Sequence, residues 1–306
     1  MSENTLGLFK EKYHYVYSPS SLSRQKKVIK AIPKSEIIIN KLPIPDKFKP
    51  NLEIPQYPPV IIFPPTKHLM WPVSLNGDSQ IKSYRMFIPN EFPLYIISYD
   101  THLPSDHTSE SIARDFHEFL RDIVQEPGII MGISYGGSIA IPFAAMYPEW
   151  VNKLILMVST YTVRGAGVEL AKELLRLAKE GKPFTLKRKI EDLYHLKILR
   201  KIFQLQFWRE WPDLEESMNP LSTFINAYSH LLNSPQSRKK YLSKIDAPTL
   251  IIGGTEDQFA SVEDYEETRD LIPNAFLELY DGQTHTVPIE KIFDVSDIIK
   301  KFIRNQ

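Results

Sequence analysis

Three residues of this chain, Ser134, Asp257 and His285, have the types and positions that nucleophilic catalysis requires. A serine hydroxyl is a poor nucleophile at neutral pH. It needs a base within hydrogen-bond reach, usually a histidine that a carboxylate orients. Each of the three residues comes shortly after an apolar run that predicts a strand. Because the carboxyl ends of parallel strands gather at one edge of an open sheet, we expect the three side chains to meet there.

Ser134 lies in the segment Gly132-Ile133-Ser134-Tyr135-Gly136-Gly137, between an apolar run and a helix-like run. This pattern is typical of a sharp strand-to-helix turn that exposes a serine hydroxyl above the sheet edge. The turn forces an unfavourable backbone conformation on the serine. Side chains two residues to either side would collide there, which explains both glycines. The following helix directs its free N–H groups towards whatever reacts with the serine.

Each of the three residues also has a simpler interpretation. Ser134 could be only a small residue in a tight turn, and His285 could be a surface loop histidine. Glu256 competes with Asp257 for the role of the acid, because the two carboxylates are adjacent after the same strand. The strand and helix that flank Ser134, and the order serine, acid, histidine, favour the catalytic interpretation.

The elements that must position these residues alternate between strands and helices. Strands are predicted where continuous apolar runs occur, over 60–63, 94–98, 128–131, 154–158, 248–252 and 275–280. The segment 64–68 after the first of these strands is predicted to be a loop. Helices are predicted over about 79–87, 138–146, 261–271 and 289–303. A further helix is predicted to begin with Thr108 or Ser109 as its N-cap. This alternation predicts βαβ units and a doubly wound, mostly parallel sheet, so the fold class is α/β.

From 164 to 233 the alternation stops and every pattern is helical. A first helix ends near Gly181, a second begins at Thr185 and runs towards Trp211, and a third begins at Asn219-Pro220. We interpret 164–233 as an all-helical cap inserted into the sheet domain.

The sheet domain is predicted to comprise 1–163 and 234–306. Its first part, 1–58, is an N-terminal extension with poorly defined elements. Alternating tyrosines predict a strand within 12–18, and a helix over 20–32 and a strand over 35–40 are further candidates. Proline-rich sequence then leads to the strand at 60–63.

The composition excludes several classes of protein. A chain of 306 residues with 42% hydrophobic residues can bury a large core. Lys and Arg together number 37, as do Asp and Glu. This charge balance does not indicate a nucleic-acid-binding surface or a polybasic membrane-binding surface. The absence of Cys excludes disulfides, thiolate nucleophiles and cysteine-based metal sites. It fits a reducing compartment, so we expect a cytoplasmic protein.

No membrane-directed segment is expected. Residues 1–12 lack the apolar run of a signal peptide. Residues 127–148 carry no charge, but their glycines and Pro142 predict a strand, a turn and a buried helix, not a membrane span.

Together the motifs resemble those of the α/β-hydrolase fold. The turn around Ser134 matches the family's Gly-x-Ser-x-Gly, the segment 247–257 is similar to the strand that delivers the acid, and 281–285 is similar to the histidine turn. The resemblance covers roughly residue 59 to the C-terminus and includes a helical cap in the usual place. It implies a serine hydrolase without cofactor or metal, in which the family spacing favours Asp257 over Glu256 as the acid.

The resemblance also implies an oxyanion hole, and here the sequence departs from the family pattern. One donor would be the backbone N–H of Tyr135. The other would come from the loop after Phe63, where many relatives have His-Gly and this chain has Pro64-Pro65. Because proline has no N–H, the second donor is predicted to be Thr66, or else Lys67.

Aromatic residues of the cap predict part of the substrate site. Packing onto the sheet domain is the ordinary role of each, but a subset that faces Ser134 would line an apolar acyl or aryl pocket. The candidates are Phe203, Phe207, Trp208 and Trp211.

Other charged and titratable residues receive structural interpretations. Lys187-Arg188-Lys189 is interpreted as a solvated face, and Glu215-Glu216 as a less favoured site for a substrate amine. Four histidines that cluster before the turn at Ser134 are interpreted as structural or solvated, with His117 inside a helix; they are His68, His102, His107 and His117.

The leading hypothesis is a carboxylesterase-like hydrolase that cleaves a small ester with apolar groups through an acyl-enzyme. The same triad would serve amide, thioester or C–C bond hydrolysis, or acyl transfer, and the sequence does not separate these reactions. A second class stays open, a ligand-binding protein of this fold with little turnover. The expected partner is a small acyl substrate, with no nucleic acid and no membrane span.

Overall fold

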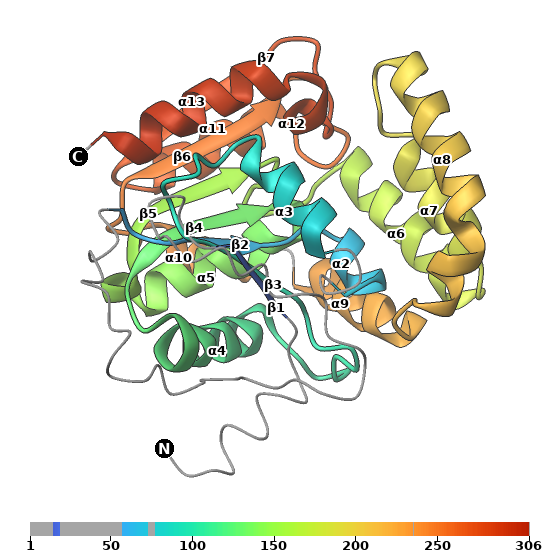
Figure 1. The fold of residues 1–306 in the computed structure, drawn as a ribbon, viewed down its shortest axis with the longest axis horizontal. Helices are drawn as coiled ribbons and strands as arrows, with labels where there is room; N and C mark the ends of the chain where they lie inside the picture. Colours follow the sequence, from blue (N-terminus) through green and yellow to red (C-terminus); the bar gives the residue numbers. More distant parts are fainter. Residues whose placement is uncertain (1–14, 19–56, 73–76, 235, 306) are drawn as a thin grey trace, which may run out of the picture.

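The computed structural model describes residues 15–18, 57–72, 77–234 and 236–305 (Figure 1). Within them, seven strands form one sheet in the order β1-β3-β2-β4-β5-β6-β7. Only the pairing of β1 with β3 is antiparallel, so the predicted mostly parallel α/β sheet is confirmed. The strands are β1 (Tyr15–Ser18), β2 (Val60–Phe63), β3 (Leu94–Ile97), β4 (Gly128–Ile133), β5 (Val151–Met157), β6 (Thr249–Gly254) and β7 (Ala275–Tyr280).

Helices connect the strands and cover both faces of the sheet. Those outside the cap are α2 (Lys67–Met70), α3 (Gly77–Arg85), α4 (Ser109–Phe119), α5 (Gly137–Met146), α10 (Lys239–Leu242), α11 (Val262–Leu271), α12 (Val287–Glu290) and α13 (Ile292–Arg304). Shorter turns are the π-helical η3 (Leu120–Val124) and the 3-10 turns η4 (Ser134–Gly136) and η5 (Pro148–Trp150).

The side chains of β2 show how the two faces are filled. Ile61 and Phe63 belong to one buried cluster together with residues of α4 and α5. Val60 and Ile62 belong to a second cluster together with residues of α13. A strand that is buried on both faces must be apolar at every position, which is why the central strands read as continuous apolar runs.

Two helix starts confirm the predicted caps. The Thr108 side chain accepts from the Ser111 N–H, and the Ser261 side chain accepts from the Asp264 N–H. In both cases the side chain at the third helical position bonds back to the cap residue. These capping boxes use otherwise unpaired N–H groups, and therefore local sequence is enough to place the helix starts.

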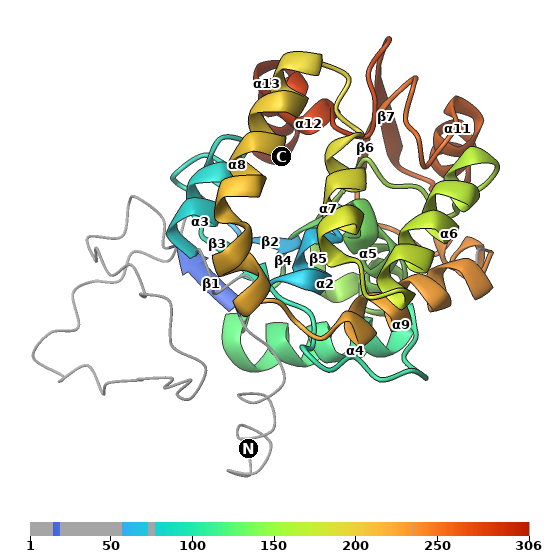
Figure 2. The same cartoon turned by 90° about the vertical axis from the view of Figure 1, so that its right-hand side faces the viewer.

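The first four helices after β5, which we call the cap, are α6 (Ala166–Lys179), α7 (Pro183–Glu191), α8 (Lys197–Glu216) and α9 (Leu221–Asn233). In Figure 1, α6, α7 and α8 lie to the right of the sheet, and Figure 2 views them from that side. The predicted domain boundaries, 1–163 and 234–306 for the sheet domain and 164–233 for the cap, stay predictions.

Three sequence-based predictions of elements were wrong. The helix expected from Thr185 towards Trp211 is two helices, because the backbone at Leu193 is held by tertiary hydrogen bonds from Gln258 and Thr284. The loop expected over 64–68 becomes helical at Lys67, in α2. The closing helix is divided into α12 and α13 at Lys291, whose backbone leaves the helical region (φ −117°, ψ 37°).

The N-terminal predictions are only partly testable. β1 lies inside the strand predicted within 12–18, whereas the helix expected over 20–32 and the strand over 35–40 lie outside the described residues. The uncharged segment 127–148 folds as β4, η4 and α5, as predicted. Among the residues that the structure describes, no helix has the length and apolarity to cross a bilayer.

Candidate active site

Ser134 occupies the sharp turn between β4 and α5. Its φ of +50° is in the left-handed region, which a non-glycine residue rarely adopts. A Cβ at Gly132 would lie 2.7 Å from the Cα of Gly137, and one at Gly136 would lie 1.9 Å from the carbonyl oxygen of Phe63. Both glycines are therefore required by close backbone approaches, and Gly136 fixes the turn against the loop that follows β2.

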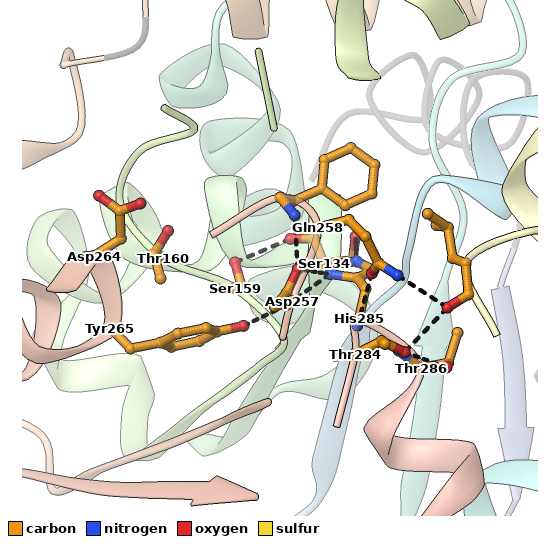
Figure 3. A network of polar contacts seen from close by, with 12 residues as sticks. Ser134, Ser159, Thr160, Asp257, Gln258, Asp264, Tyr265, Thr284, His285 and Thr286 are labelled. Atoms are coloured by element: carbon orange, nitrogen blue, oxygen red, sulfur yellow. Dashed lines mark hydrogen bonds and ion pairs between the residues drawn. The ribbon is translucent and has the colours of Figure 1, made fainter. Parts of the chain in front are cut away.

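The structure brings the three predicted residues together at the carboxyl ends of β4, β6 and β7 (Figure 3). His285 Nε2 lies 2.8 Å from Ser134 Oγ, and His285 Nδ1 lies 2.9 Å from each carboxylate oxygen of Asp257. A carboxylate accepts only, so Nδ1 carries the proton that bonds Asp257. That leaves Nε2 with its lone pair directed at the serine hydroxyl, which is the arrangement of a general base.

The Asp257 side chain is fully buried and receives two further hydrogen bonds. The Tyr265 hydroxyl donates to Oδ2 at 2.6 Å, and the Phe259 N–H donates to Oδ1 at 2.8 Å. A buried carboxylate needs such donors to stay ionised. The adjacent Glu256 is exposed, so the structure places Asp257, and not Glu256, against His285.

Tyr265 was not singled out from the sequence. Its ring lies on the backbone of β6, where a Cβ at Gly253 would be only 2.4 Å from the ring carbon that bears the hydroxyl. The glycine therefore lets the phenol reach Asp257. The Gly253-Gly254 pair in the sequence indicates that another group approaches the backbone closely, but only the structure shows that this group is the Tyr265 ring at Gly253.

The loop that carries His285 is connected to the cap. The His285 N–H donates to Gln258 Oε1 at 3.1 Å, and Gln258 Nε2 donates to the Leu193 carbonyl at 3.1 Å. The Thr284 hydroxyl donates to the same carbonyl at 3.0 Å. The segment between α7 and α8 therefore contributes to the position of the histidine loop.

Ser159, at the end of β5, was also missed. Its hydroxyl donates to the Ser134 carbonyl at 3.0 Å, and a Cβ at Gly137 would lie 1.9 Å from that hydroxyl. The preceding Val158 has a φ of +45°, a strained conformation for a β-branched residue. Strain of this kind beside the serine indicates that the surrounding contacts hold the turn in one conformation.

The predicted oxyanion residues, Tyr135 and Thr66, are joined by a tyrosine of the cap. The Tyr228 hydroxyl shares a 3.1 Å hydrogen bond with the Thr66 hydroxyl, and its ring is parallel to that of Tyr135 at 6.5 Å. Tyr99 fixes the same loop, because its hydroxyl donates to the Pro64 carbonyl at 2.5 Å and its ring meets the edge of Tyr135. The Pro64-Pro65 loop is thus restrained by two buried phenols.

Three of the four predicted pocket residues take part in ring contacts in the cap. Phe207 and Trp211 are in contact with each other at 5.1 Å, and both contact Phe184. Phe203 stacks on Tyr194 at 4.8 Å. Trp208 is exposed, so the structure separates it from the other candidates.

The charged residues of the cap differ from the sequence interpretation at one position. Arg188 and Lys189 are exposed, as expected of a solvated face. Lys187 is instead half-buried, lies over the Phe207 ring and forms an ion pair with Glu191. Burial, and then the positive charge of Lys67, lower the pKa of Lys187 to about 7.

The other predicted residues lie away from the triad contacts. Glu215 and Glu216 are exposed near the end of α8. His68 and His107 are buried with Nδ1 on backbone carbonyl oxygens, and His117 stacks on Tyr147 at 3.9 Å. Across the described ranges, no cluster of three or more histidine and carboxylate side chains could hold a metal ion.

The sheet order, the turn at Ser134 and the three meeting strand ends are those of the α/β-hydrolase fold. The chain belongs to the α/β-hydrolase fold family, whose model matches residues 77–292.

Similar proteins include enzymes named as lipases. The chain is 25% identical over 215 residues to Lipase 3 of Moraxella sp., and the match covers 65% of this chain and 64% of the lipase. It is 24% identical to the sn-1-specific diacylglycerol lipase ABHD11 of Danio rerio, over 64% of this chain and 63% of that protein. The chain therefore spans slightly less than two thirds of these relatives.

Solved structures agree on the fold. The crystal structure of MGS-M2, an α/β-hydrolase enzyme from a deep-sea metagenome library, superposes with a TM-score of 0.67 at 17% identity. The superposition covers 96% of this chain and 94% of that one.

Proposed function

We propose that the protein is a serine hydrolase that cleaves a small ester with apolar groups. The observation that carries the proposal is the unbroken hydrogen-bond chain from Ser134 Oγ through His285 to Asp257. The Asp257 carboxylate, the His285 imidazole and the Ser134 hydroxyl are already joined by hydrogen bonds, so no rearrangement is needed to activate the serine.

In the proposed reaction, Ser134 Oγ attacks the ester carbonyl carbon while His285 Nε2 takes the hydroxyl proton. The tetrahedral intermediate collapses, the C–O bond to the alcohol breaks, and His285 returns the proton to the leaving oxygen. A water then attacks the acyl-enzyme with His285 as base, which releases the acid and restores Ser134. Asp257 orients the imidazole and stabilises its charged form throughout.

The backbone N–H groups of Tyr135 and Thr66 are proposed to bind the oxyanion. Gly136 packs directly on the loop after β2, which supports a short separation between the two donors. Tyr99 and Tyr228 hold that loop, so its donors need little reorganisation when charge develops.

An apolar substrate is supported by the surroundings of His285 and by the relatives. The Phe259 ring meets the imidazole edge at 4.7 Å, and Tyr135 and Tyr228 are buried beside the proposed oxyanion loop. The similar proteins named as lipases act, by those names, on lipid esters. Phe207 and Trp211 stay candidates for the acyl pocket, while Trp208 no longer is one.

A fluorophosphonate probe tests the proposal directly, because it phosphonylates only an activated serine. We expect one adduct, mapped to Ser134, and none in Ser134→Ala. A panel of p-nitrophenyl esters of rising acyl-chain length then tests the apolar pocket, and a preference for charged or peptidic substrates would contradict it. A folded protein that neither reacts with the probe nor hydrolyses any ester would instead be a binding protein of this fold.

A further inference from the structure

The cap helix α8 is apolar on both sides, and only one side is covered. On the inner side, Phe207 is buried and Trp211 packs against the main core. On the outer side, four large apolar residues, Ile198, Ile202, Leu205 and Trp208, are 66%, 51%, 67% and 67% exposed. Their spacing of four, three and three residues places them on one face of the helix. We call this face the outer stripe.

The outer stripe holds much of the exposed apolar surface of the described residues. Across all the described residues nine large apolar side chains are exposed; four of them form the stripe, and a fifth, Leu196, directly precedes α8. Scattered exposed leucines are ordinary, whereas a contiguous row marks an interaction surface. Figure 2 shows α8 in the foreground with no other helix or strand over it.

Positive charge accompanies the stripe. From Lys197 to Arg209 the helix carries four cations, Lys197, Arg200, Lys201 and Arg209, and no acidic residue. Lys197, Lys201 and Arg209 are exposed, and no ion pair is recorded for them within the described ranges. By helical position, Lys201 and Arg209 lie on the same face as Ile202 and Leu205. The chain as a whole has a formal net charge of zero, so its overall composition does not reveal this local positive charge.

The start of α8 lies beside α12. The Leu196 N–H donates to Glu290 Oε1 at 2.9 Å, and the neighbouring Ile289 and Phe293 are 44% and 80% exposed. The apolar surface therefore continues from α8 towards the loop that carries His285.

We propose that the outer stripe of α8 docks on the surface of an anionic lipid bilayer. Exposed isoleucine, leucine and tryptophan side chains would enter the headgroup–acyl boundary, while the surrounding lysine and arginine side chains contact lipid phosphates. This places α8 of the cap against the membrane. The proposal concerns binding alone and does not depend on the proposed hydrolysis.

A second copy of this chain fits the stripe less well. A two-fold pair centred on Leu205 would bring Lys201 of each helix against Arg209 of the other. Like charges opposed at an interface disfavour association. An anionic lipid surface instead matches both the apolar row and its cations.

Vesicle binding by the full-length Ser134→Ala protein tests the proposal without any lipid turnover. We expect co-sedimentation with vesicles of phosphatidylcholine and phosphatidylglycerol, weaker binding to pure phosphatidylcholine, and weakening by salt. Of the four tryptophans, Trp208 should be quenched by brominated lipids, and Trp208→Phe should remove that response.

Two variants separate the apolar and electrostatic contributions. Ile202→Gln with Leu205→Gln should lower the partition coefficient by about tenfold or more. Lys201→Glu with Arg209→Glu should remove the preference for anionic lipid. The matched control is Phe276→Gln on β7, since Phe276 is similarly exposed, at 63%, and lies elsewhere. It should bind like the parent.

Several outcomes would overturn the proposal. They are no binding of folded protein to anionic vesicles, equal binding by the Ile202→Gln/Leu205→Gln protein, and protection of Trp208 from acrylamide in the free protein. Self-association that this double substitution abolishes, without vesicle binding, would assign the stripe to a second copy instead.

Discussion

The hydroxyl of Tyr228, on the cap, lies 3.1 Å from the hydroxyl of Thr66, on the loop after β2. The Tyr228 ring also stacks over the Tyr135 ring, so one cap residue contacts the side chains of both residues whose backbone N–H groups are the proposed oxyanion donors. The cap therefore contributes to the proposed site through a side chain 162 residues away in sequence.

Tyr228→Phe tests that relationship. Removing the hydroxyl deletes the hydrogen bond that holds Thr66. If about 1 kcal/mol of transition-state stabilisation is lost with it, kcat should fall by roughly fivefold to tenfold with little change in KM. Steady-state kinetics with a p-nitrophenyl ester give both values. Tyr241→Phe is the control, because its hydroxyl also bonds, to Glu110 at 3.0 Å, but outside the triad contacts. An unchanged kcat for Tyr228→Phe would exclude the positioning role.

Asp257→Asn should lower kcat by about 10³–10⁴ while the protein stays folded, because the amide supports the wrong imidazole tautomer. Glu256→Gln, at the exposed neighbouring position, should keep nearly full activity. Circular dichroism and initial rates on the two purified proteins suffice. The reverse ranking would transfer the acid role to Glu256.

Tyr265→Phe should affect stability and rate together. The buried Asp257 carboxylate loses its 2.6 Å hydrogen bond, which we expect to cost about 1–3 kcal/mol in the free energy of unfolding and several-fold in kcat. Urea unfolding and ester hydrolysis measure the two effects. If neither changes, the phenol is not needed to hold the acid.

Gly136→Ala should be far more damaging than Gly181→Ala. The added methyl group at Gly136 overlaps backbone atoms of Phe63 and Pro64. A methyl group added at Gly181 would meet no atom within 4 Å, so the only cost there is the strain of a side chain at positive φ. We expect Gly181→Ala to cost about 1 kcal/mol of stability and no activity. Gly136→Ala should abolish hydrolysis in any protein that still folds, and full activity there would contradict the described turn.

His68 predicts a pH dependence of stability. Loss of hydration on burial, and then the positive charge of Lys67, hold the pKa of His68 at about 3, against an ordinary value of 6.5. A depressed histidine pKa means that the unfolded chain binds the extra proton. Stability from this residue is thus complete above pH 6.5 and is lost as the pH falls towards 3.

Urea unfolding of the wild type and His68→Gln at several pH values measures the effect. The advantage of the wild type should shrink by about 2 kcal/mol between pH 7 and pH 5. A constant difference between wild type and His68→Gln would show that His68 is not the titrating group.

Local sequence predicted the features that depend on neighbours in the chain. Thr108 and Ser261 predicted helix starts because a cap is completed within three residues. Ser134, Asp257 and His285 could be proposed together because parallel strands end at one edge, a rule of topology that needs no side-chain detail.

The sequence by itself determined the α/β alternation and the three strand-end residues. Only the tertiary structure decided which ring reaches Asp257, which tyrosine holds Thr66, and which face of α8 is left uncovered. Periodicity reports that a helix has apolar sides, but burial depends on what packs against each side. Tyr228 reaches Thr66 across 162 residues of sequence, a contact that no local pattern encodes. Tyr265 is only eight residues from Asp257, but it reaches the carboxylate because its ring lies over Gly253 in the fold.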